Sequence, residues 1–161
     1  MLYHIFNIIN LVMNKTITIF GGSGFTGSYI VRRLSKLGFR IIIPTSNIIK
    51  ANRLKINGDV GQVIILDIFE YNLKLIKNII KDSDIIINLK TIWLEKNNKS
   101  FENEIYNFNI MLVDVIKEFK IKKYIFFSGL GTNINSSSKR TIAIAKSENY
   151  IQKNLNDYSI I

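Results

Sequence analysis

The sequence predicts an α/β domain built on a doubly wound parallel sheet of about six strands. Short apolar runs alternate with longer amphipathic segments, and the apolar runs are nearly continuous. Such strands are buried on both faces, and helices of ten or more residues between them make each strand run parallel to the one before it. The length of 161 residues suits a single domain.

Strands and helices are expected to alternate along the whole chain. The expected strands are residues 15–20, 40–43, 62–66, 84–89, 123–127 and 158–161. The expected helices, each with one apolar face, are residues 29–37, 70–81, 100–119 and 141–155. Gly38 should end the first helix and Pro44 the second strand. The polar residues 131–140 predict a loop after the fifth strand, at the edge of the sheet where such folds bind ligands.

The composition excludes several kinds of site. The chain has no cysteine and one histidine, His4, which excludes a disulfide scaffold and a cysteine nucleophile, and no metal site is expected. The net charge of +10 is compatible with a nucleic-acid or anionic membrane partner. Most of the cations, however, are lysines scattered along a chain that is also rich in isoleucine and asparagine, which is the composition that AT-rich genomes impose. No nucleic-acid partner is therefore expected.

The first thirteen residues, MLYHIFNIINLVM, are apolar but too short to cross a membrane. Asn7 and Asn10 interrupt them, and they lack the basic region of a signal peptide. Two interpretations stay open: residues 1–13 are a short extension packed on the domain, or Met13 is the true start. In both, the folded domain comprises residues 14–161, and no transmembrane segment is expected.

A glycine-rich turn, GGSGFTG, follows the first expected strand and precedes the first expected helix. It fits GxGxxG through Gly22, Gly24 and Gly27, and GxxGxxG when Gly21 replaces Gly22. In this context glycines allow a tight turn, let backbone N–H groups approach a pyrophosphate, and let the helix N-terminus face the anion. The sequence therefore predicts a Rossmann-type dinucleotide site formed by Gly21, Gly22, Ser23, Gly24, Phe25, Thr26 and Gly27.

The end of the second strand indicates which dinucleotide binds. A carboxylate there would accept hydrogen bonds from the 2′-hydroxyl of NAD, and this chain has none. Thr45, Ser46 and Asn47 can instead bond a 2′-phosphate. The cations that could neutralise this phosphate are Arg32, Arg33, Lys50 and Arg53. NADP(H) is therefore favoured, with NAD(H) as the alternative.

Two more residues are assigned to the cofactor site because they lie at strand ends. Asp67, at the end of the third strand, is placed to accept a hydrogen bond from the adenine amino group. Alternatively, Asp67 caps the helix that follows. Leu89, at the end of the fourth strand, is the second of these cofactor residues.

Four segments resemble a known superfamily. ITIFGGSGFTGSYIVRRL, GDVGQVIILDI, DIIINL and KKYIFFSGLG are similar to atypical short-chain dehydrogenases/reductases, in their NAD-dependent epimerase/dehydratase-like branch. Within this superfamily the chain most resembles the family of NADPH-binding accessory subunits of respiratory complex I and their bacterial relatives, over residues 14–161. Members carry an arginine at the position aligned with Ser46, so the resemblance implies that a basic contact to the 2′-phosphate is lost here.

The resemblance also implies where catalysis would occur. Active members of the superfamily use a Tyr-x-x-x-Lys pair on the helix after the fifth strand, in which the lysine binds the ribose and lowers the tyrosine pKa. Lys146 fits this lysine, and Ile142 then stands at the tyrosine position. Ser128 fits a strand-end hydroxyl that would hold the substrate, although the usual position, one or two residues on, begins at Gly129. Tyr150 is expected to pack rather than react.

The vacant tyrosine position, taken with the resemblance, implies an NAD(P)-binding domain that is structural and not catalytic. The alternative is an NAD(P)H-dependent reductase or epimerase of the short-chain type that works through substitute residues. Because the chain stops within YSII, we expect a C-terminally shortened domain without the substrate lobe of its relatives. The resemblance implies a respiratory-chain assembly as partner, and a cytoplasmic location, peripheral at the inner membrane, or the mitochondrial matrix in a eukaryote.

Overall fold

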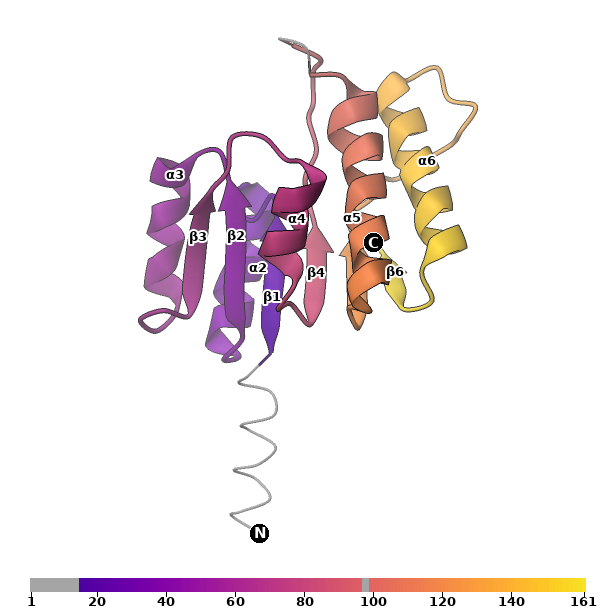
Figure 1. Cartoon of the computed structure of the whole chain (residues 1–161). Helices are drawn as coiled ribbons and strands as arrows, with labels where there is room; N and C mark the ends of the chain where they lie inside the picture. Colours follow the sequence, from indigo (N-terminus) through magenta and orange to yellow (C-terminus); the bar gives the residue numbers. More distant parts are fainter. Residues whose placement is uncertain (1–14, 97–98) are drawn as a thin grey trace.

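The computed structural model describes residues 15–96 and 99–161, which are organised around a six-stranded parallel sheet. The strand order is β3-β2-β1-β4-β5-β6, so the chain begins in the middle of the sheet, winds outward to β3, and then winds outward to β6 (Figure 1). This order is that of a Rossmann-type fold and confirms the predicted fold class. The extension or alternative start considered for residues 1–13 lies outside the described residues.

The strands are short and rich in isoleucine, whose branched side chain suits a buried pleated backbone. They are β1 (Thr16–Phe20), β2 (Arg40–Thr45), β3 (Val63–Asp67), β4 (Ile85–Asn88), β5 (Lys123–Phe126) and β6 (Tyr158–Ile160). Strand β1 is buried throughout because it lies between β2 and β4, with Ile17 opposite both Ile41 and Ile85. All the carboxyl ends of the strands therefore meet at one edge of the sheet.

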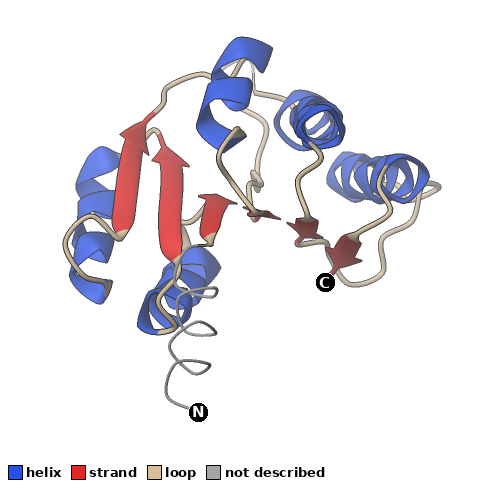
Figure 2. Ribbon diagram, turned by 60° about the horizontal axis from the view of Figure 1, so that its bottom comes forward, coloured by secondary structure: helices blue, strands red, loops and turns tan. Residues whose placement is uncertain are grey.

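Helices cover both faces of the sheet (Figure 2). They are α2 (Phe25–Lys36), α3 (Ile48–Asn52), the 3₁₀ helix η1 (Arg53–Asn57), α4 (Leu73–Ile80), the π-helix η2 (Glu102–Asn107), α5 (Phe108–Phe119) and α6 (Lys139–Asn154). Ile76, Leu112 and Ile144 place α4, α5 and α6 in one core. Val31 and Leu54 place α2 and η1 in the core on the opposite face. None of the helices in the described ranges is long and apolar enough to cross a membrane.

Two expected boundaries were wrong near the glycine turn. Helix α2 begins at Phe25, four residues before the expected start, because the turn leads directly into the helix. Strand β2 does not end before Pro44 but continues to Thr45. At Pro44 the strand is paired with Leu66 of β3, while its register with β1 ends at Ile42. The missing N–H of proline therefore breaks no bond of the β1–β2 ladder.

Helices α3 and η1 were not expected at all. The Asn47 side chain starts α3 by accepting a hydrogen bond from the N–H of Lys50 at 3.0 Å. Ala51 and Leu54 are buried, and each short helix has only five residues, too few to show a helical period in the sequence. The next turn is held by Gln62, whose side-chain amide donates to the carbonyl oxygens of Ser35 and Phe39.

A buried hydrogen-bond network connects the second half of the sheet to α5 and α6. The Asn88 amide donates to the hydroxyl of Tyr124 at 3.0 Å, and that hydroxyl donates to Asn109 at 2.6 Å. The Asn109 amide reaches the carbonyl oxygen of Ser147, and Asn88 also accepts the N–H of Lys90. Burial raises the pKa of Tyr124, so its hydroxyl stays protonated and can donate. The network therefore fixes the position of the chain just after β4.

Replacing Tyr124 by Phe should destabilise the domain. The change leaves the buried Asn88 amide and Asn109 carbonyl without their partner, and each such loss costs about 1–3 kcal/mol. Tyr150→Phe is the matched control, because the Tyr150 hydroxyl bonds Asp114 on the surface. Urea denaturation measures both free energies of unfolding, and equal small losses in the two variants would contradict the role given to the buried network.

Candidate functional site

The glycine turn between β1 and α2 brings three stretches of backbone into close contact. Gly21 has a φ of +77°, and a Cβ there would lie 2.9 Å from the carbonyl carbon and oxygen of Leu89, just after β4. A Cβ on Gly27, in the first turn of α2, would lie 2.5 Å from the Gly21 oxygen and 2.6 Å from the Cα of Gly22. A side chain at either position would collide with backbone, so the packing of β1, α2 and the end of β4 requires glycine there.

The same turn leaves the N-terminus of α2 suited to an anion. Gly24 is the N-cap of this helix, no side chain caps it, and its first turn contains no acidic residue. The first N–H groups of a helix have no carbonyl partner within it, and the helix dipole adds partial positive charge at that end. Gly24 has an ordinary extended backbone, and a Cβ there would lie 3.1 Å from the Gly21 oxygen. The packing of the turn therefore requires glycine at position 24 less strictly than at positions 21 and 27. A glycine at position 24 leaves space for an anion at the N-terminus of α2.

The residues predicted at the end of β2 lie beside the glycine turn. The buried Thr45 hydroxyl is 3.0 Å from the hydroxyl of Ser23 and accepts the N–H of Asn47 at 3.1 Å. The Asn47 side chain caps α3 and is thereby committed to that helix. Ser46 is exposed and lines a cavity. The structure thus brings Ser46 to an open site, while Thr45 and Asn47 organise the backbone around it.

This cavity has a volume of about 630 Å³ and lies beyond the ends of β3 and β4. Ile68 and Tyr71 line it from the segment after β3, and Lys90 lines it from the segment after β4. Lys99 and residues of η2 form another side. The cavity therefore adjoins the edge where the sequence predicts the adenine end of a dinucleotide.

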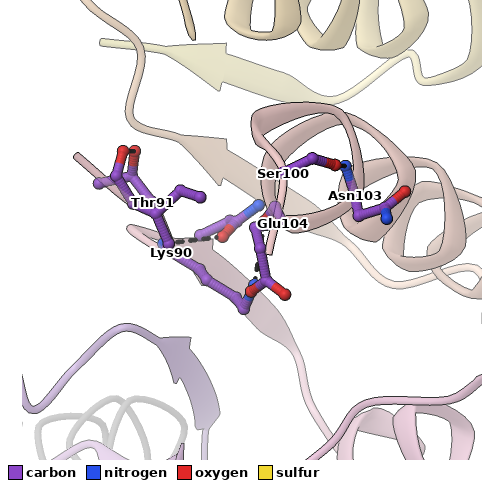
Figure 3. Close-up of polar contacts among 7 residues, drawn as sticks. Lys90, Thr91, Ser100, Asn103 and Glu104 are labelled. Atoms are coloured by element: carbon purple, nitrogen blue, oxygen red, sulfur yellow. Dashed lines mark hydrogen bonds and ion pairs between the residues drawn. The ribbon is translucent and has the colours of Figure 1, made fainter. Parts of the chain in front are cut away.

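An ion pair that sequence reasoning missed lies in this cavity. Figure 3 shows Lys90 reaching across to Glu104, and its ammonium bonds the Glu104 carboxylate at 2.6 Å and the Glu104 carbonyl oxygen at 3.0 Å. The same ammonium lies 4.6 Å from the centre of the Phe108 ring and 5.8 Å from that of Tyr71. The pairing depends on η2 folding across the end of β4. Lys90 and Glu104 are fourteen positions apart, and the residues between them carry no pattern that would have indicated the pairing.

Burial sets the protonation of these groups. It lowers the pKa of Lys90, against the opposing effect of Glu104, and the nearby charge of Lys99 lowers it further. Burial, with a contribution from the charge of Glu104, raises the pKa of Tyr71 to about 12. Tyr71 is therefore a neutral phenol near pH 7. The Glu104 carboxylate counters the charge of Lys90, whereas no ion pair with Lys99 is found among the described residues.

Two predicted cofactor residues lie at this same edge. Asp67 is the exposed last residue of β3, opposite Thr45 of β2. The alternative interpretation of Asp67 as a helix cap was wrong, because α4 begins at Leu73 and its cap is Asn72, which accepts the N–H of Leu75 at 2.9 Å. Leu89 is half-buried, and its backbone contacts the glycine turn.

The candidate catalytic residues are engaged with neighbouring side chains. Lys146 forms an ion pair with Glu102 of η2 at 3.0 Å and lies over the ring of Tyr106. The Ser128 hydroxyl donates to Glu148 of α6. Ile142, which was placed at the tyrosine position, is half-buried. The roles of Lys146 and Ser128 in catalysis stay predictions.

The side of α6 nearest the ends of β4 and β5 carries other residues. The Ile144 side chain lies 3.8 Å from where a Cβ of Gly129 would be. One turn earlier, the Arg140 guanidinium donates to the carbonyl oxygen of Ile92 and stacks on the ring of Trp93 at 4.3 Å. Residues two apart on a helix point about 200° apart, so Ile144 and Lys146 face different neighbours. Neither Ile144 nor Arg140 supplies the hydroxyl that a tyrosine would present to a substrate.

Known proteins match the chain in sequence and in fold. The sequence pattern of the NmrA-like family matches residues 13–153. The chain belongs to this family. The mitochondrial NADH dehydrogenase (ubiquinone) 1 alpha subcomplex subunit 9 of Rattus norvegicus is 31% identical over 134 residues, which are 81% of this NmrA-like chain and 36% of the relative. The protein of the same name from Arabidopsis thaliana is 32% identical over 146 residues, which are 89% of this chain and 36% of the relative.

These relatives confirm the resemblance to the complex I subunit family, and the NmrA-like chain spans little more than a third of their length. Among solved structures, the Bordetella bronchiseptica enzyme WbmH in complex with NAD+ superposes with a TM-score of 0.74 at 15% identity. The match covers 91% of this chain and 55% of WbmH. It confirms the Rossmann-type fold.

Gly27→Ala should destabilise this NmrA-like domain, because the new methyl group would lie against the backbone of Gly21 and Gly22. Overpacking of this kind costs about 1–3 kcal/mol. Gly129→Ala is the matched control, since a Cβ there meets only ordinary contacts at 3.8 Å and beyond. Thermal melts should show a lower Tm for Gly27→Ala alone. A Gly27→Ala variant as stable as the wild type would contradict the close packing described for the turn.

Proposed function

We propose that this NmrA-like domain binds NADP(H) at the glycine turn and uses it as a structural ligand, without catalysis. One observation carries the proposal: Gly21 and Gly27 bring β1, α2 and the end of β4 into backbone contact, directly below the uncapped N-terminus of α2. Such a turn, at the carboxyl edge of a doubly wound sheet, is suited to a pyrophosphate.

The other predicted residues fit the two ends of the same ligand. The backbone of the turn from Gly22 to Thr26 would hold the pyrophosphate. Asp67, at the end of β3, would accept from the adenine amino group, and the cavity beside Ser46 would take the adenine ribose. When bound, the nicotinamide supplies hydride-transfer chemistry. Near the end of β5 the polar groups bond one another: the hydroxyls of Ser128 and Thr132 both donate to the Glu148 carboxylate, so we assign these residues to packing of α6 against the end of β5.

The preference for NADP(H) over NAD(H) rests on charge. Residues 45–47 contain no carboxylate to bond a 2′-hydroxyl. Ser46 lines the same cavity as Lys90 and Lys99, and Glu104 already neutralises Lys90. Lys99 is therefore the cation we assign to the 2′-phosphate, in place of the arginine that the complex I family carries at the position of Ser46. Lys50, which follows the cap of α3, is the competing candidate.

The absence of catalysis rests on α6. In the register suggested by the sequence, Ile142 takes the place of the tyrosine, and Lys146 is paired with Glu102. On the side of α6 that faces the ends of β4 and β5, Arg140 and Ile144 occupy the corresponding spacing. Both registers lack the tyrosine that active members of the superfamily use to exchange a proton with the substrate. A reductase or epimerase that uses substitute residues is the alternative.

The relatives suggest a setting for this ligand. Because the two matching proteins are mitochondrial NADH dehydrogenase subunits by name, we place the domain in a respiratory-chain assembly, in the mitochondrial matrix of a eukaryote or at the cytoplasmic side of a bacterial membrane. In that setting a bound dinucleotide would stabilise the domain through its binding energy.

Replacing Gly24 by Val should abolish dinucleotide binding and leave the domain folded. The side chain would fill the room above the turn, whereas its Cβ meets the backbone less closely than at Gly21 or Gly27. A titration with NADPH, followed by protein fluorescence, should show no saturable binding by the variant at concentrations that saturate the wild type. An unchanged Kd in a folded Gly24→Val protein would contradict the proposed site.

Lys99→Gln should weaken binding of NADPH about three- to fivefold and leave binding of NADH unchanged, because only NADPH carries the phosphate that the lysine would pair with. Lys50→Gln is the matched control and should change neither. If Lys50→Gln lowers NADPH affinity and Lys99→Gln does not, the phosphate is held by α3 and the assignment to Lys99 is wrong.

The purified protein should give no turnover of NADPH with aldehydes, ketones or nucleotide sugars beyond the rate without protein. Absorbance of the reduced nicotinamide measures this directly. Turnover that Lys146→Ala abolishes, in a protein that still binds NADPH, would establish the reductase alternative.

A further inference from the structure

The positive charge of this protein is concentrated in its first third. Residues 1–58 contain eight lysines and arginines and no acidic residue, and Asp59 is the first carboxylate of the chain. The remaining residues contain fourteen cations and twelve carboxylates. Four of the five arginines lie between residues 32 and 53. Drift towards AT-rich codons enriches lysine, so it does not account for this group of arginines. The cations as a whole are spread along the chain, as expected from the sequence, and the net charge of the first third is high because carboxylates are missing there.

The fold gathers six of these eight cations on one side of the molecule. We call this surface the basic face and define it by six exposed residues of α2, η1 and the start of β2: Arg32, Arg33, Lys36, Arg40, Arg53 and Lys55. Helices α2 and η1 share one core on the same side of the sheet. The Gln62 amide ties the loop after η1 to the end of α2 through hydrogen bonds of 2.7 Å and 3.1 Å. The basic face is therefore continuous across these elements.

The cations of the basic face have no counter-ions within the chain. Every ion pair among residues 15–96 and 99–161 involves other lysines. The residues outside these ranges carry no acidic side chain. Asp59, in the loop after η1, is the one carboxylate close by in sequence. Uncompensated like charges repel one another, so a surface of this kind is suited to an anionic partner.

Exposed aliphatic side chains lie among these cations. Leu37, at the end of α2, is 61% exposed, and Ile56 of η1 is 87% exposed. Val60, in the loop that Gln62 ties to α2, is fully exposed. Aliphatic groups offer no stacking surface to nucleotide bases, but they insert readily into the boundary between lipid headgroups and acyl chains. The combination favours a lipid surface over a nucleic acid.

The basic face also has the shape for a lipid surface. It is formed by the outer sides of two helices and the start of β2, and none of its six cations lines the cavity beside Ser46 or the smaller one beside Lys146. A compact anion or an acidic peptide needs a groove, whereas a bilayer accepts a convex face. Helices α2 and η1 also run away from the glycine turn, so contact there leaves the carboxyl edge of the sheet open (Figure 1).

We infer that the basic face binds the surface of an anionic phospholipid bilayer, with Leu37, Ile56 and Val60 entering the headgroup region. Each lysine or arginine near such a surface raises the partition coefficient roughly fivefold, and the attraction falls within a Debye length as salt is added. Binding of this kind is peripheral and reversible. It is independent of the dinucleotide, because it uses the opposite end of α2.

Vesicle co-sedimentation of the full chain tests this inference. The probes are vesicles of phosphatidylcholine alone and vesicles containing about 30% phosphatidylglycerol. The test variant is K36Q/R40Q/K55Q, which removes three cations of the basic face. The control variant is K74Q/K81Q/K153Q, which removes three exposed lysines, one on α4, one at its C-cap and one on α6, and has the same net charge. Thermal melts check that both variants are folded.

The wild type and the control should bind the anionic vesicles and should not bind the neutral ones. Salt at about 0.5 M should release both proteins from the anionic vesicles. The test variant should bind the anionic vesicles at least tenfold more weakly than the wild type. A second variant, I56S/V60S, removes two of the exposed aliphatic side chains and should reduce the binding that remains at intermediate salt. Equal binding by the test and control variants would overturn the inference, because net charge alone would then explain it. Failure of the wild type to bind anionic vesicles would overturn the inference as well. If that protein instead binds a single-stranded RNA of about 20 nucleotides tightly, the basic face is a nucleic-acid surface.

Discussion

The close contact of three backbone segments at the glycine turn is the constraint on which the rest of the structure depends. Gly21, Gly27 and the chain after β4 approach so closely that a methyl group would not fit between them. This contact fixes α2 against β1 and directs the helix N-terminus to the carboxyl edge of the sheet. It also fixes where the chain leaves β4, and hence where Lys90 enters the cavity. The same backbone contact therefore determines both the fold and the position of the candidate site.

Much of the fold could be predicted because its signals are local. Short apolar runs mark all six strands, and the glycine spacing marks the turn. The start of α2 was misplaced because its first turn, beginning at Phe25, reads as part of the glycine loop. Pro44 predicts a strand end in the sequence. Whether β2 tolerates it depends on which neighbouring strand pairs with it, and that is a tertiary property. Helices α3 and η1 were missed because each buries few side chains.

The candidate site could also be predicted only where its residues depend on local sequence signals. The strand-end positions of Ser46, Asp67 and Leu89 follow from where the strands end along the chain, which the sequence predicts closely. The pairing of Lys90 with Glu104 could not be predicted, because it needs a π-helix to place Glu104 over the end of β4. Lys146 illustrates the limit of spacing arguments: a fit to Tyr-x-x-x-Lys says which residues share a helix face, but not what that face contacts. Here it contacts Glu102.

The central claim is that the backbone of the glycine turn holds a dinucleotide pyrophosphate, and amide chemical shifts test it most directly. In a ¹⁵N–¹H spectrum of the 18.6 kDa chain, added NADPH should shift the amides of Gly22, Gly24 and Phe25 first and most. The amides of Ile151 and its neighbours in α6, on the opposite side of the sheet from α2, should stay in place. Saturating NADPH that leaves the turn unshifted, or that shifts only residues far from it, would contradict the account.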